Sequence, residues 1–250
     1  MAREPKESPG GGRTLGISRQ RGERWGHFAT RVADAFGLVL LLVLATYVLG
    51  SLTPSHGWTA ALTILVATTA AVVALASAEL RLLLVRAAAL LALAAVVLAV
   101  LSAILDVRSL LGASALITAF LLLVAAGAIL RTVVAETEVG FRTILGAISV
   151  YIILGLLFTF LYVALDRIES SPFFGAGVQV ERGDTLLFSF TTLTTTGYGN
   201  LVPAGQPGKL FAGLEMLMGN VFLVTLVAGL VSLWRPGMRR RQAATNARRD

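Results

Sequence analysis

Three threonines, followed by two glycines that flank a tyrosine, form the segment whose residue types and spacing could do chemistry. The segment reads Thr194-Thr195-Thr196-Gly197-Tyr198-Gly199-Asn200. Glycine adopts positive φ angles without steric penalty, so alternating glycines allow successive backbone carbonyls to point the same way. Four such segments around one axis would stack rings of oxygens that replace the water around a dehydrated monovalent cation. We therefore predict that this backbone coordinates a cation.

The chain contains few of the residues that build catalytic sites or side-chain metal sites. It holds no cysteine, only two histidines and only 14 acidic residues, which excludes disulfides, thiolate sites and histidine-based metal clusters. Asp34, Glu79, Glu136 and Glu138 are scattered and form no catalytic motif. We predict that the protein is not an enzyme and needs no organic cofactor.

The composition is that of a membrane protein. Hydrophobic residues make up 56% of the chain and charged residues 14%, and the mean hydropathy is +0.81. A helix needs about 20 apolar residues to cross the hydrocarbon. Six apolar stretches approach this length: 36–52, 59–78, 87–105, 110–130, 144–165 and 209–234. We predict an all-α membrane protein with six transmembrane helices.

The basic residues indicate how the chain is oriented. All but four of the 21 lie before the first span, between spans two and three, between spans four and five, or after the last span. The exceptions are Arg108, Arg167, Arg182 and Lys209. The positive-inside rule then places both termini in the cytoplasm. This bias also explains the net charge of +7 without any nucleic-acid partner.

Both ends of the chain are basic and polar. We predict that residues 1–32 and 235–250 are cytoplasmic tails, the first of them disordered, because neither can bury an apolar core. Contact with anionic lipid is one role for them; topology and solubility alone are the simpler one. The Ala-, Leu- and Arg-rich composition is typical of a multi-pass protein of the bacterial inner (plasma) membrane.

The segment between spans five and six differs from the rest. A polar stretch leads to Asp184, an N-cap candidate for a short apolar helix that continues to Leu193. Such a helix is too short to cross a bilayer, so we predict that it is re-entrant, followed by backbone that is buried or lines water.

In this setting, Thr195-Thr196-Gly197-Tyr198-Gly199 resembles the selectivity filter of the potassium channel family, with Thr196 at the usual Val position. The resemblance covers about a third of the chain and includes Pro203 and the Gly208-Lys209 pair. It implies a pore domain over 141–234, built from an outer helix, a pore helix, the filter and an inner helix.

The resemblance also implies roles for single residues. The carbonyls of Thr195, Thr196, Gly197 and Tyr198 would coordinate K⁺, and the Thr195 hydroxyl would complete the innermost site. Gly199 would give the outer mouth backbone freedom. The Tyr198 ring would pack outward against the pore helix and hold the loop.

Four residues depart from the family pattern. Asn200 stands where many members have Asp, and Thr191 where some have a buried acidic residue. Leu187-Phe188 is the nearest match to the aromatic pairs, commonly Trp, that brace the filter. We expect these changes to alter filter stability and inactivation rather than K⁺ coordination.

Three residues of the last span are further candidates for the gate or cavity. Gly219 lies where the family has a hinge glycine, with close helix packing as the alternative. Asn220 faces the cavity or makes an interhelical hydrogen bond. Glu215 is an ionisable residue within a span, which we expect to form a hydrogen bond near the pore helix, with a proton sensor as the alternative.

We predict that residues 33–131 form a four-helix region like that of a voltage sensor, without gating charges. Its fourth span, 110–130, contains no Lys or Arg, and Arg108 and Arg131 only flank it. We therefore predict a voltage-independent channel. The chain has one filter and no internal repeat, so four chains must assemble as a homotetramer.

The sequence thus predicts passive, potassium-selective transport through a tetrameric pore. A non-selective monovalent cation channel is the nearest alternative, because Asn200 and the weaker brace could loosen the outer sites. A K⁺ transporter subunit is a second alternative, although such transporters usually carry four filter-like loops in one chain. A structural or regulatory membrane protein with a relic filter is a third.

Overall fold

The computed structural model describes residues 36–52, 57–78, 80–135, 140–169, 171–178, 180 and 182–234. Regular secondary structure in these ranges is entirely helical. In chain order the elements are the helix Phe36–Leu52, α2 (Gly57–Ser77), α3 (Leu82–Leu105), α4 (Arg108–Ala135), α5 (Phe141–Ile168), α6 (Arg182–Leu193) and α7 (Gly208–Trp234). The tails predicted at 1–32 and 235–250 lie outside the described residues.

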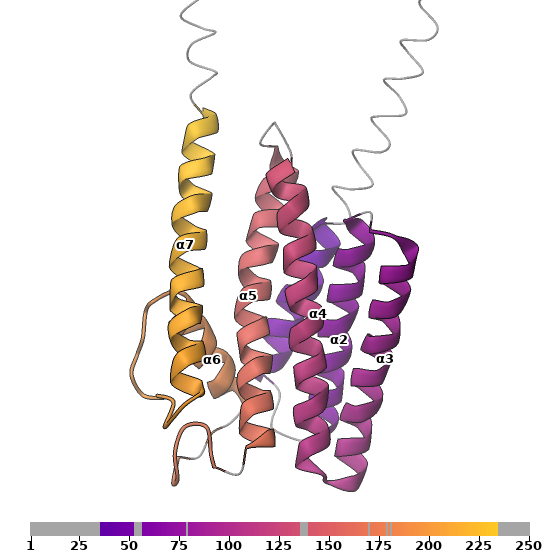
Figure 1. Ribbon diagram of the computed structural model, residues 1–250, viewed down its shortest axis with the longest axis vertical. Helices are drawn as coiled ribbons and strands as arrows, with labels where there is room; N and C mark the ends of the chain where they lie inside the picture. The colour runs from indigo at the N-terminus through magenta and orange to yellow at the C-terminus, as the bar shows by residue number, and fades with distance from the viewer. Residues whose placement is uncertain are drawn as a thin grey trace, which may run out of the picture.

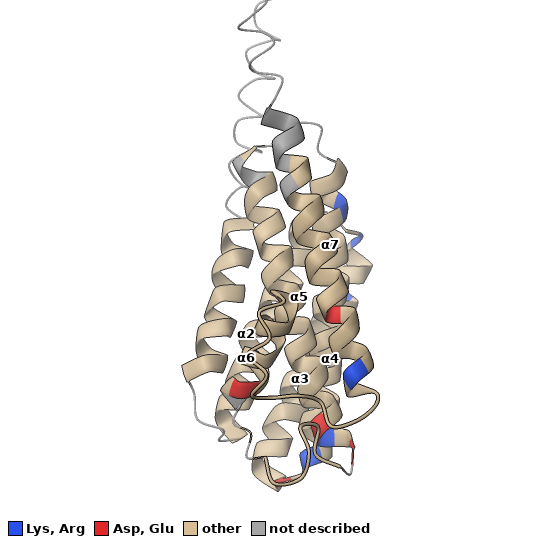
Figure 2. Ribbon diagram, turned by 90° about the vertical axis from the view of Figure 1, so that its left-hand side faces the viewer, with Lys and Arg blue, Asp and Glu red and all other residues tan. Residues whose placement is uncertain are grey.

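Five of these helices, α2, α3, α4, α5 and α7, are long and apolar enough to cross a membrane. They run roughly parallel in one bundle (Figure 1), and charged residues gather mainly near the helix ends (Figure 2). The chain is therefore an α-helical membrane protein. The helix Phe36–Leu52 is apolar but shorter, so a sixth span stays a prediction.

The helices extend beyond the predicted apolar stretches. Arg86, expected in a link, lies inside α3. Arg108 and Arg131 were expected to flank the fourth span, but Arg108 is the first residue of α4 and Arg131 lies inside α4, before its last turn. Long arginine side chains can reach the aqueous interface from such positions, so a helix continues past its apolar stretch. The middle of α4, between these two arginines, still carries no charge.

Small side chains hold the first helices together. The buried residues of α2 and α4 are mostly alanine, threonine and serine, and those of α3 are only Ala88, Ala95 and Ala99. Apolar side chains gain nothing by leaving lipid, so helices in membranes associate where small residues allow close approach. The leucines of α3 remain largely exposed.

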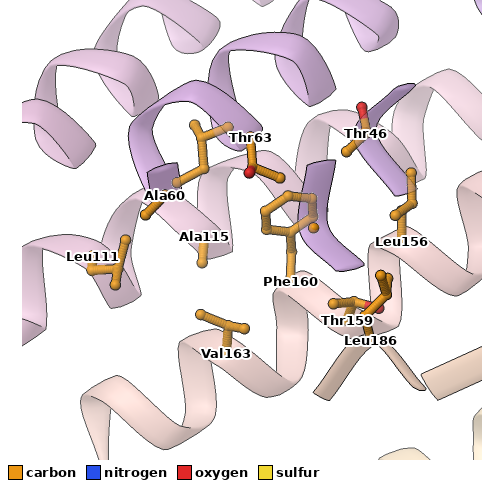
Figure 3. A pocket seen from close by; sticks show the side chains of 12 residues that line it. Thr46, Ala60, Thr63, Leu111, Ala115, Leu156, Thr159, Phe160, Val163 and Leu186 are labelled. Carbon is orange, nitrogen blue, oxygen red and sulfur yellow. The ribbon is translucent and has the colours of Figure 1, made fainter. Parts of the chain in front are cut away.

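The first helices pack against the second half of the same chain. α4 lies beside α5 (Figure 1), and the Tyr47 ring of the helix Phe36–Leu52 meets Phe190 of α6 edge-on at 4.9 Å. At this junction an apolar cavity of about 40 Å³ reaches Leu186 of α6 (Figure 3). The hydroxyls of Thr46, Thr63 and Thr159 at its wall donate to carbonyls of their own helices and need no water.

Candidate functional site

The short helix α6 positions the Thr-Gly-Tyr-Gly segment. It begins at Arg182, so Asp184 lies in its first turn and is not the N-cap predicted from the sequence. A carboxylate there still stabilises the positive end of the helix dipole. At the other end, the Thr194 N–H donates to the Phe190 carbonyl and the Thr195 N–H to the Thr192 carbonyl. The segment therefore starts at the negative end of α6, which favours cations.

The Thr191 carbonyl fixes the course of the chain after α6. It accepts the N–H groups of both Thr196 and Gly197, at 2.8 and 3.1 Å. The Thr194 hydroxyl donates to the Phe190 carbonyl at 2.7 Å and lies 2.8 Å from the Thr196 hydroxyl. Thr191, predicted as a filter-support position, thus supports the segment through its backbone oxygen, which any residue type could provide.

The backbone of the segment alternates in handedness. Thr195, Gly197 and Gly199 have positive φ angles of +57°, +52° and +76°. Thr196 and Tyr198, which lie between them, do not have positive φ angles. In a β-strand, successive residues point to opposite sides; alternating φ signs turn alternate peptide planes and can bring successive carbonyls to one side. Thr195 has a Cβ, so its left-handed conformation costs about 1–2 kcal/mol.

The side chains of this segment are open in a single chain. All residues from Thr194 to Asn200 are exposed, and Tyr198 is 70% exposed. The packing expected for its ring against α6 is therefore not made within one chain. Among the described residues, no group of three or more His, Asp or Glu side chains could hold a metal ion. Cation binding here would depend on backbone oxygens.

An aromatic cluster packs behind α6. Phe188 is buried among Tyr162 of α5, at a ring distance of 5.3 Å, and Phe173 and Phe174 of the preceding loop, at 6.2 and 5.1 Å. Leu187, the other half of the predicted brace, is 42% exposed. The brace of α6 therefore comes from α5 and the loop rather than from a pair of neighbouring aromatic residues.

The loop after the segment is tied to the same cluster. The Ala204 N–H donates to the Phe173 carbonyl at 2.9 Å, and the Phe173 N–H donates to Asp166 Oδ1 at 3.3 Å. Pro203 is buried there, and a Cβ on Gly208 would lie 2.7 Å from the Phe173 ring. These contacts hold both ends of the segment to one scaffold.

Two glycines, one on α5 and one on α7, allow these helices to approach α6 closely. A Cβ on Gly155 of α5 would lie 2.6 Å from the Phe190 ring. A Cβ on Gly219 of α7 would lie 2.1 Å from the Leu193 carbonyl oxygen, at the last residue of α6. Gly219 is therefore a position of close helix packing, and its role as a hinge stays a prediction.

The two polar candidates on α7, Glu215 and Asn220, have different environments. Asn220 is exposed in the single chain. Glu215 is 0% exposed, with Oε1 2.5 Å from the Ser189 hydroxyl of α6 and Oε2 2.6 Å from the Tyr162 hydroxyl of α5. Glu215 therefore lies where α5, α6 and α7 meet.

Sequence reasoning missed several residues of this site. Tyr162, Ser189 and Gly155 belong to apolar stretches and carry no recognisable motif, so only their meeting in space identifies them. Phe173-Phe174 was a usable signal, because an aromatic pair in a polar loop predicts contact with a buried surface.

Residues 150–235 match the model of an ion channel family. The match runs from within α5 to just past α7 and contains α6, the Thr-Gly-Tyr-Gly segment and the Glu215 junction. No match was found among curated proteins or among solved structures. The match supports an ion channel in the membrane rather than an enzyme.

Proposed function

We propose that four copies of the chain form a potassium-selective channel that passes K⁺ passively and is not steeply gated by voltage. The observation that carries this proposal is the alternation of φ signs from Thr195 to Gly199, directly after the negative end of α6. The carbonyls of Thr195, Thr196, Gly197 and Tyr198 and the hydroxyl of Thr195 would replace the hydration shell of K⁺, the transported ion.

Assembly into a ring of four copies is supported by the surface that one chain leaves exposed. A single segment supplies one column of oxygens, and its residues 194–200 are all exposed. Only 17% of the most apolar part of α7 is buried, against 67% for α5. A ring of subunits would cover Tyr198 and α7, and closed cyclic symmetry would place the four segments around one axis.

The absence of steep voltage gating rests on α4, which begins at Arg108 and carries no further charge before Arg131, near its other end. The proposal places the protein in the plasma (inner) membrane with both termini in the cytoplasm. The helices run alternately up and down the bundle (Figure 1), so the α2–α3 link, the end of α4 and the end of α7 lie at the same end of the bundle.

Flux measurements on purified full-length protein in liposomes test the proposal. We expect K⁺ flux that exceeds Na⁺ flux by orders of magnitude and is blocked by Ba²⁺. Gly197→Ala should abolish selectivity, because Gly197 has a φ of +52° that alanine adopts poorly. Gly177→Ala is the matched control: its φ is +89°, a Cβ there also meets nothing within 4 Å, and it lies outside the segment.

The outcomes separate the alternatives. Equal K⁺ and Na⁺ flux would refute selectivity and favour a non-selective cation channel, and would point to Asn200 and Thr191. Flux that requires a coupled ion or saturates steeply would favour a transporter subunit. If Gly177→Ala impaired selectivity as much as Gly197→Ala, the alternating backbone would not be the selective element.

A further inference from the structure

The three-helix junction around Glu215 contains a hydrogen-bond chain that the proposed ion pathway does not use. Glu215, Ser189 and Tyr162 are each 0% exposed. Ser189 Oγ lies 2.5 Å from Glu215 Oε1 and also 2.7 Å from the Gly155 carbonyl oxygen. Tyr162 Oη lies 2.6 Å from Glu215 Oε2.

The number of hydrogens available for these contacts indicates the protonation state of Glu215. The Ser189 hydroxyl has one hydrogen, and the Gly155 carbonyl can only accept. When Ser189 donates to Gly155, the contact of 2.5 Å with Oε1 needs a hydrogen on the carboxyl group. When Ser189 donates to an ionised Oε1 instead, its oxygen faces the carbonyl at 2.7 Å with no hydrogen between them. Only a protonated Glu215 provides one hydrogen for each of the three contacts.

The charge environment leads to the same protonation state. The ion pairs recorded in the described part of the chain join Asp166 to Arg108 and Arg167, and neither involves Glu215. An ionised carboxylate buried within the bilayer without a cation is strongly unfavourable. A neutral carboxyl with two hydroxyl neighbours avoids that penalty.

We infer that Glu215 is a positioning residue whose protonated carboxyl fastens α6 between α5 and α7. Hydrogen bonds run from Tyr162 to Oε2, from Oε1 to Ser189, and from Ser189 to Gly155. Two residues after Ser189, Thr191 holds the N–H groups of Thr196 and Gly197. The chain therefore fixes α6 at the point from which the ion-coordinating segment is held. Its effect on ion selection rests on the proposed function; the hydrogen-bond chain itself does not.

Two replacements of Glu215 distinguish hydrogen bonding from packing. In Glu215→Gln, the amide can donate to Ser189 and accept from Tyr162, as the protonated carboxyl does. Glu215→Leu keeps an apolar volume of similar size and loses both bonds. Tyr162→Phe and Ser189→Ala each remove one link without altering Glu215. Tyr151→Phe is the matched control, because the Tyr151 hydroxyl is also buried on α5 and has no hydrogen-bond partner among the described residues.

The test has two readouts on purified full-length protein. The first is the infrared difference spectrum between the wild type and Glu215→Gln. We expect the wild type to show the carbonyl band of a protonated carboxylic acid that the variant lacks. A carboxylate signal in its place would overturn the hydrogen-bond chain, and this readout holds even if the protein passes no ions.

The second readout is the K⁺/Na⁺ flux ratio in liposomes. We expect Glu215→Gln and Tyr151→Phe to keep the wild-type ratio. Glu215→Leu, Tyr162→Phe and Ser189→Ala should each lower it by about tenfold, the order of change that one lost buried hydrogen bond produces. Equal loss in Glu215→Gln and Glu215→Leu would overturn the role of the neutral carboxyl. An unchanged ratio in all three disrupting variants would overturn the positioning role.

Discussion

Gly219→Ala tests how closely α7 must approach the end of α6. The added Cβ would lie 2.1 Å from the Leu193 carbonyl oxygen and 3.0 Å from its carbonyl carbon. Carbon and oxygen atoms without a strong bond normally approach to about 3.3–3.6 Å, so α7 and α6 must separate by about 1 Å. The obstacle is backbone, which cannot rotate away as a side chain could.

The magnitude follows from two opposing effects. Overpacking of this kind costs about 1–3 kcal/mol, and replacing a glycine inside a helix by alanine returns about 1 kcal/mol. We expect a net loss of up to about 2 kcal/mol in the free energy of unfolding. The apparent melting temperature of the detergent-solubilised protein should fall by several degrees, since each kcal/mol corresponds to about 2–4 °C at this chain length.

Gly213→Ala is the matched control on the same helix, because a Cβ there meets nothing within 4 Å. Its melting temperature should stay unchanged or rise slightly. The K⁺/Na⁺ flux ratio should fall in Gly219→Ala and not in Gly213→Ala. Equal melting temperatures and flux ratios in both variants would refute the packing argument. A normal melting temperature with altered channel opening in Gly219→Ala would indicate a hinge instead.

Two further predictions concern the neighbouring helices. Gly155→Ala should lower the melting temperature, because its Cβ would lie 2.6 Å from the Phe190 ring. Gly127→Ala should leave the melting temperature unchanged, because a Cβ there meets nothing within 4 Å. Equal effects of the two variants would contradict the close packing of α6 on α5. In planar bilayers, the open probability should change little over about 100 mV. Each gating charge contributes about 2.3 kcal/mol per 100 mV, and the middle of α4 carries no such charge. A steep voltage response would contradict this reasoning.

Much of the fold follows from chemistry that the sequence displays locally. Apolar stretches of sufficient length predicted the spans of α2, α3, α4, α5 and α7, because hydrocarbon thickness sets helix length. The ends of the helices were less predictable. An arginine beside an apolar stretch is compatible both with a link and with a helix that continues past that stretch. The sequence does not distinguish these two cases for Arg86, Arg108 and Arg131.

The candidate site divides in the same way. The Thr-Gly-Tyr-Gly segment is contiguous, so its residue types alone predicted a cation-coordinating backbone between two spans. The support of α6 is not contiguous. It comes from three helices, whose packing brings the residues together: Gly155 and Tyr162 on α5, Ser189 on α6, and Glu215 and Gly219 on α7.

The sequence by itself determined that the chain is membrane-embedded and helical, and where along it the backbone proposed to coordinate ions lies. Hydropathy and glycine spacing are properties of neighbouring residues, so no tertiary information is needed. Only the tertiary structure decided that Phe188 rather than Leu187 joins the aromatic cluster, that the Leu193 carbonyl lies against Gly219, and that Glu215 reaches Ser189 and Tyr162. Those contacts depend on the rotation and approach of whole helices, which small residues far apart in the sequence jointly set.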